Sequence, residues 1–106
     1  MMKNGTANNK LVVEVQYWGG WGYGRYYKSL RDFLYAQPDL ANRIVVQERP
    51  DHGITGNFEV TTTAGNGDVI VLHSKRSGKV GRCNTDAERY DLVDKLQDIL
   101  SEQLQE

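Results

Sequence analysis

The chain has 106 residues, of which 39% are hydrophobic, and this length and composition predict a single domain with one small core. Its 13 basic and 14 acidic residues leave a net charge of −1, which argues against nucleic acid as a partner and against a disordered chain. There is no apolar run near the roughly 20 residues of a membrane helix and no apolar signal-peptide core, so we expect no membrane partner and a cytoplasmic location.

The first elements predicted are a tail, a strand and a loop. Residues 1–10 are polar and lack periodicity, which predicts a disordered N-terminal tail before one domain at residues 11–106. Apolar residues alternate with others from Leu11 to Tyr17, which is typical of a strand. The segment from Trp18 to Gly24 then holds four glycines and predicts a tight loop.

A helix and a second strand follow this loop. Apolar residues recur at steps of three and four from Tyr23, and Pro38 should end this amphipathic helix near Gln37. The segment Arg43–Glu48 contains three consecutive β-branched residues and predicts a short strand. We expect the two strands to be parallel, and we interpret the following segment, Arg49–Gly56, as a loop.

The second half of the chain predicts a hairpin, a basic loop and a helix. Asn57–Thr63 and Val69–His73 resemble strands joined through an Asn-Gly turn. Lys75–Arg82 carries four basic side chains and two glycines, which we interpret as an exposed loop. Thr85 and Glu88 have the spacing of a capping box, so a second helix should begin there.

This order of elements, β-α-β-β-β-α, predicts an α/β (α+β) fold of the thioredoxin-like type, with a four-stranded mixed sheet and two helices. The ends of the first and fourth strands and the start of the third should then meet at one edge. That edge collects the Trp18–Gly24 loop, the Ile54–Asn57 loop and the basic loop that leads to Cys83. Ligand sites in α/β proteins favour strand ends, so this edge is the predicted site.

Several motifs along the chain then carry a family resemblance. They are Val13–Tyr17, Gly22-Tyr23, Thr55–Val60 and Leu72–Lys75. Together they resemble the selenoprotein W family, also called the Rdx group, over roughly residues 11–100. The resemblance implies a thioredoxin-like fold and a thiol- or selenol-dependent oxidoreductase role in redox homeostasis, with glutathione as a redox partner and redox-regulated proteins as further partners.

In that family a Cys-x-x-Sec or Cys-x-x-Cys pair occupies the first loop. The matching positions here are Trp18 and Trp21, which enclose Gly19 and Gly20. Thiol–disulfide exchange needs a thiolate or selenolate as the attacking group, and an indole cannot supply one. The sequence as written is therefore expected to lack the family's redox activity.

Three explanations compete for the two tryptophans. We favour replacement of a redox pair, because the selenocysteine codon UGA differs by one base from the tryptophan codon UGG and from the cysteine codons. The second explanation is a natural, non-catalytic interaction module that uses exposed indoles as partner anchors. In the third, both rings simply pack, although the glycine-rich surroundings are expected to offer little surface for them.

The remaining candidates concern the edge and alternative chemistries. Gly19, Gly20, Thr55, Gly56 and Cys83 are predicted to form the edge that meets a substrate or partner. Cys83 precedes a helix and follows basic residues, so an activated thiolate is a conditional hypothesis beside that of an unreactive surface thiol. Neither a dinucleotide motif nor a P-loop is complete, and the histidines lack ligand spacing. We therefore predict no metal and no bound cofactor, with selenium present only if a selenocysteine has been replaced.

Overall fold

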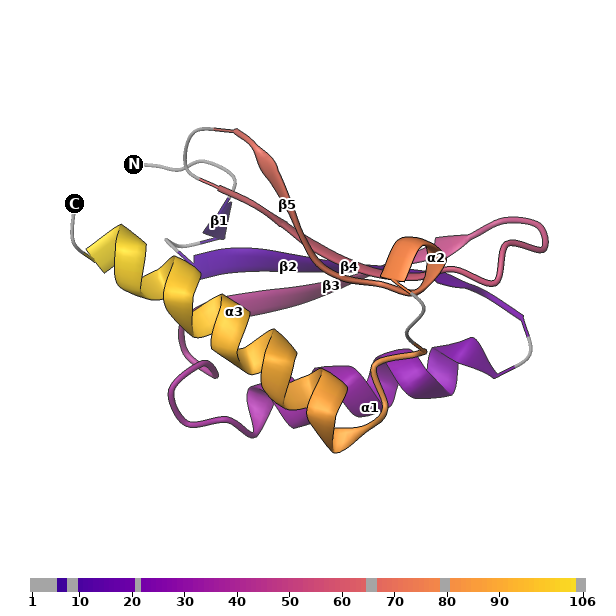
Figure 1. Cartoon of the computed structure of the whole chain (residues 1–106), viewed down its shortest axis with the longest axis horizontal. Helices are drawn as coiled ribbons and strands as arrows, with labels where there is room; N and C mark the ends of the chain where they lie inside the picture. The colour runs from indigo at the N-terminus through magenta and orange to yellow at the C-terminus, as the bar shows by residue number, and fades with distance from the viewer. Residues whose placement is uncertain (1–5, 8–9, 21, 65–66, 79–80, 105–106) are drawn as a thin grey trace.

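The computed structural model describes residues 6–7, 10–20, 22–64, 67–78 and 81–104. The described chain forms two layers, in which helices α1 (Tyr23–Tyr35) and α3 (Asp86–Leu104) lie on the same face of one sheet (Figure 1). A third, one-turn helix, α2 (Lys75–Gly78), lies at the end of the sheet. Within the described ranges, no helix is long and apolar enough to cross a membrane.

The sheet has four principal strands and one short additional strand. They are β1 (Thr6–Ala7), β2 (Lys10–Trp18), β3 (Ile44–Asp51), β4 (Phe58–Thr63) and β5 (Val69–Ser74). The principal strands have the order β3-β2-β4-β5, and β1 pairs with the start of β2. β2 is parallel to β3 and antiparallel to β4, and β5 is antiparallel to β4. This mixed sheet confirms the predicted fold class and the predicted order of the principal strands and two long helices along the chain.

The core lies between the sheet and the two helices. Burial alternates along β2, so that Leu11, Val13, Val15 and Tyr17 are buried while the residues between them are half-buried. The apolar stripes of the helices supply the other side of the core: Tyr23, Tyr27, Leu30 and Leu34 from α1, and Leu92, Val93, Leu96 and Leu100 from α3. The residues that are buried therefore recur with the predicted periods, two along β2 and about 3.6 along the helices.

Several boundaries differ from the sequence predictions. β1 lies within the stretch predicted to be a disordered tail, and β2 begins at Lys10. β3 continues through Pro50 to Asp51, because β3 is an edge strand, where a proline need not donate a hydrogen bond to a neighbour. The predicted exposed loop at 75–82 is wrong for its first part, which forms α2. Trp18 is the last residue of β2 rather than the first of the loop.

Candidate functional site

The predicted convergence of strand ends is present in the structure. Tyr17 near the end of β2 pairs with Phe58 at the start of β4, and Glu59 pairs with Ser74 at the end of β5. The backbone N–H of Trp18 donates to the carbonyl of Asn57 at 3.0 Å. The end of β2, the loop 52–57 and the end of β5 therefore form one continuous border, which we call the strand-end edge.

Trp18 is packed into this edge. Its half-buried indole contacts the core and meets the ring of Tyr23 edge to face, with 5.5 Å between the ring centroids. A Cβ atom on Gly20 would come within 2.9 Å of the indole, so the glycine leaves the room that the ring fills. The expectation that the glycine-rich loop offers little packing is therefore wrong for Trp18. Trp21 lies outside the described residues.

The N-terminus of α1 faces the loop without a side-chain cap. Gly22 precedes the helix with φ of 76°, a left-handed conformation that favours glycine, and no side chain caps the helix. The N–H of Tyr23 donates to the carbonyl of Gly20 at 3.1 Å, and the first turn contains no acidic residue. The partial positive charge of this helix terminus is therefore not offset by a carboxylate from its own first turn.

Asp51 organises the loop on the other side of Trp18. Its carboxylate accepts hydrogen bonds from the side chains of Gln16 (2.7 Å), Thr55 (2.9 Å) and Asn57 (2.9 Å). Burial alone would raise the pKa of Asp51, but these hydrogen bonds and nearby Arg49 outweigh it and hold the pKa below its usual value. Sequence reasoning missed this carboxylate, which Pro50 and His52 flank in a segment predicted to be a loop.

Thr55 and Gly56 maintain the conformation of the same loop. Besides donating to Asp51, the Thr55 hydroxyl accepts a hydrogen bond from the backbone N–H of Asn57 at 3.2 Å. Gly56 has φ of 64°, which a residue with a Cβ would adopt only with strain. The observed role of both predicted site residues is thus to position Asn57, whose carbonyl binds the Trp18 backbone.

Cys83 is buried, contrary to the predicted surface position of its thiol. Its side chain is inaccessible to solvent, and its thiol donates weakly to the carbonyl of Glu88 at 3.9 Å. Burial, followed by the negative charge of Glu88, raises the pKa of the Cys83 thiol to about 12. The burial contradicts the predicted surface position, and the raised pKa argues against an activated thiolate and agrees with an unreactive thiol.

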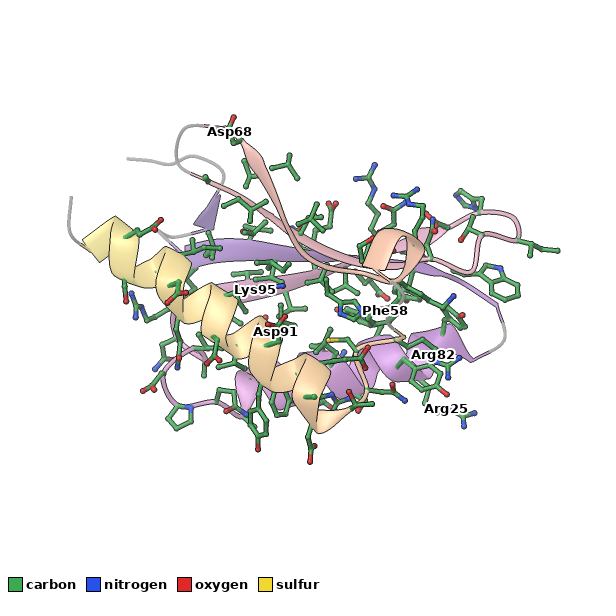
Figure 2. The ribbon with its side chains drawn as sticks, in the orientation of Figure 1. Arg25, Phe58, Asp68, Arg82, Asp91 and Lys95 are labelled. Atoms are coloured by element: carbon green, nitrogen blue, oxygen red, sulfur yellow. The ribbon has the colours of Figure 1, made fainter. Side chains whose placement is uncertain are left out.

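Arg82, the residue before Cys83, is an unexpected part of the edge. Its guanidinium lies over the Tyr26 ring at 4.6 Å and near the Tyr23 ring at 5.8 Å. Both tyrosines belong to the first turn of α1, so Arg82 lies against that turn, as Figure 2 shows. Arg82 was predicted to belong to an exposed basic loop, and no sequence pattern indicated that Tyr23 and Tyr26, three positions apart in α1, would contact it.

Two polar residues of the sheet have structural roles here. The buried carboxylate of Glu59 accepts hydrogen bonds from the Ser74 hydroxyl and from the Arg76 N–H (3.1 Å), which holds α2 against β4. His73 Nε2 donates to the carbonyl of Gly81 at 2.8 Å. Among the residues that the structure describes, no group of three or more His, Cys, Asp or Glu side chains could hold a metal ion.

The strand-end edge therefore combines an uncapped helix N-terminus, a hydrogen-bonded polar loop and a stacked arginine around residue 18. It offers no accessible thiol among its described residues, because Cys83 is buried. A scan against protein-family models and a search of curated proteins found no match to this chain. The arrangement could stabilise an anion, such as a thiolate, that lies near the first turn of α1.

Proposed function

We propose that the chain has the scaffold of a cytoplasmic, glutathione-linked thiol or selenol oxidoreductase whose reactive pair belongs at positions 18 and 21. The observation that carries this proposal is the location of the residue 18 side chain. It contacts Tyr23, the first residue of an α-helix that has neither a side-chain cap nor an acidic residue in its first turn. A thiolate at position 18 would gain stability from that helix terminus.

The chemistry requires two sulfur or selenium atoms. A thiolate at one position attacks a substrate disulfide, forms a mixed disulfide and releases one substrate thiolate, which takes up a proton. The second thiol, as its thiolate, then attacks the mixed disulfide, releases the other substrate thiol and leaves the pair oxidised. Glutathione or another thiol reductant returns the pair to the reduced state. With Trp18 and Trp21 in place, neither attack can occur.

The test restores the pair as a Trp18→Cys, Trp21→Cys double variant. We expect turnover in a disulfide-reduction assay coupled to glutathione or thioredoxin, and none for the parent chain. The matched control is the Trp18→Ser, Trp21→Ser double variant, which makes the same change in size without a thiol. A folded cysteine variant with no more turnover than the serine variant would refute the proposal. The codons for residues 18 and 21 in the natural gene provide an independent check.

A second candidate, a non-catalytic interaction module on the same fold, is favoured by the packing of Trp18. The indole fills space beside Tyr23 that Gly20 leaves open. If tryptophan is native at this position, Trp18→Cys should lower the free energy of unfolding by about 1–2 kcal/mol, since the ring is only half-buried. If cysteine or selenocysteine is native, urea denaturation should show little or no loss of stability.

A further inference from the structure

The Arg82 guanidinium lacks the partner that a half-buried arginine normally has. Its Nε atom is buried from solvent and has no hydrogen-bond partner, and no described residue forms an ion pair with the side chain. An unsatisfied buried donor costs stability and calls for an explanation. Stacking over Tyr26 at 4.6 Å occupies a face of the guanidinium, whereas its N–H groups lie in the plane of the group and point away from the ring.

Arg25 is a second cation without a described partner. It lies in the first turn of α1, beside Tyr26 in sequence, its side chain is exposed, and no described residue bonds to its guanidinium. Arg82, from the segment before α3, lies over Tyr26, the residue that follows Arg25 in α1. The nearby carboxylate of Glu88 is already bonded to the N–H groups of Gly81 and Thr85. The two arginines therefore keep their charge available to an external anion.

The distance from Arg82 to residue 18 limits the size of that anion's carrier. The Arg82 guanidinium is 5.8 Å from the centroid of the Tyr23 ring, and the centroid of the Trp18 ring is 5.5 Å from the same point. The distance between the Arg82 guanidinium and the Trp18 ring therefore cannot exceed the sum of these two lengths. An extended chain of three residues spans about 10–11 Å. A substrate could thus place its sulfur at residue 18 and a carboxylate, up to three residues away, at Arg82.

We propose that Arg82, together with Arg25, binds a carboxylate of the substrate thiol or disulfide and selects for peptide-sized thiols that carry a carboxylate within about three residues of the sulfur. Arginine suits this role because its planar fork binds a carboxylate through two parallel hydrogen bonds. The inference rests on the proposed function, since it assigns a substrate class to the same edge. It predicts that binding of the acid does not require a cysteine at position 18.

The experiment is a titration of the ¹⁵N-labelled parent chain, followed by NMR, with oxidised glutathione and with its fully esterified form. We expect saturable shifts at the amides of Arg25, Tyr26 and Cys83 with the acid, and at least tenfold weaker binding of the ester. Arg82→Gln should weaken binding of the acid at least tenfold, and Arg82→Lys should weaken it too, because lysine keeps the charge but loses the planar fork.

The matched control is Arg31→Gln, which removes the same charge from an arginine of α1 that lies over Tyr27 at 5.8 Å but is paired with Asp32. We expect this control to bind the acid as the parent does. Equal loss in Arg82→Gln and Arg31→Gln, equal binding of acid and ester, or no binding at millimolar concentration would overturn the inference. The lysine variant keeps the test valid if Arg82→Gln does not fold.

Failure of the carboxylate site and failure of the redox proposal give different results. In the variant with cysteines at 18 and 21, equal kcat/KM for acid and ester disulfides would refute the carboxylate site and leave the redox role intact. Selective binding of the acid to the parent chain, without any turnover in the cysteine variant, would refute the redox role and leave the carboxylate site.

Discussion

The two long helices begin in opposite ways. At the start of α3, Thr85 accepts a hydrogen bond from the Glu88 N–H at 3.2 Å, and Glu88 accepts from the Thr85 N–H at 3.3 Å. Glu88 also accepts from the Gly81 N–H at 2.8 Å. At the start of α1, Gly22 provides no side-chain cap, and Arg25 occupies the third helical position, which Glu88 occupies in α3.

This difference separates a structural helix start from one suited to a ligand. Acidic side chains stabilise a helix N-terminus and basic ones destabilise it. The N–H groups at the α3 terminus are satisfied by the carboxylate of Glu88. Desolvation is the main cause of the raised pKa of the buried Cys83 thiol, and the negative charge of Glu88 is the second. The α1 terminus keeps its positive potential and adds a cation to it, at some cost in stability. An anion at the strand-end edge would remove that cost.

The largest expected effect is the difference in reactivity between a thiol at position 18, beside the start of α1, and Cys83, which precedes α3. We expect Trp18→Cys, made together with Cys83→Ala, to react with iodoacetamide at pH 7 roughly a thousand times faster than Cys83 of the parent chain. The reason is that a thiol with pKa near 8.5 or lower has far more thiolate at this pH than one with pKa about 12. Labelling rates measured across a range of pH by mass spectrometry would compare the reactivity of the two thiols.

The control for this comparison is the parent chain in denaturant, where Cys83 should label as an ordinary thiol. The burial of Cys83 in the folded chain, rather than any intrinsic property, would then account for its low rate. Comparable labelling rates for the two folded proteins would contradict the proposed difference between the helix starts.

A smaller effect is expected from removing the carboxylate that caps α3. Glu88→Ala should lower the free energy of unfolding by about 1–2 kcal/mol at pH 7, because it leaves the N–H groups of Gly81 and Thr85 without their acceptor. Urea denaturation measures this loss. Asp94→Ala is a suitable control, since Asp94 is exposed on the same helix, and it should change stability by less than about 0.5 kcal/mol.

The same variant should show a defined pH dependence. Burial opposes ionisation of Glu88, but hydrogen bonds from Gly81 and Thr85 outweigh it and lower its pKa in the folded chain. A lowered folded pKa gives stability that is present above the unfolded value of about 4.3 and is lost as pH falls through the folded value. The difference in the free energy of unfolding between the parent chain and Glu88→Ala should therefore be smaller at pH 3 than at pH 7. A pH-independent difference would show that the charge of Glu88 has no part in capping.

The sequence predicted those elements whose signals are local. The alternation from Leu11 to Tyr17, the Thr85–Glu88 spacing and the parallel β-α-β unit all appear in the structure as predicted. Each depends on residues a few positions apart, or on a rule of chain connection that holds for most proteins. The convergence of strand ends at one edge followed from the topology alone.

The contacts within the edge could not be predicted, because they depend on how distant elements pack or on how a loop folds, which no local sequence pattern encodes. Burial of Cys83 depends on α3 packing against the sheet, and its surroundings rather than its basic neighbours in sequence set its pKa. Trp18 packs because Tyr23 and Gly20 happen to shape a space for it. Asp51 became the centre of a hydrogen-bond network only after β3 extended along β2 to bring it beside Gln16.

The smallest expected effect comes from making the start of α1 resemble that of α3. Arg25→Glu should raise the free energy of unfolding by about 0.3–1 kcal/mol, because it replaces a cation at the positive end of the helix with an anion. The same change should weaken binding of the carboxylate probe. Lys28→Glu, the same charge reversal one turn later on an exposed position, should give a smaller gain in stability and little loss of binding. If the two variants behave alike, the helix terminus has no special role, whereas a gain in stability with a loss of binding at position 25 alone would identify Arg25 as a residue kept for a ligand.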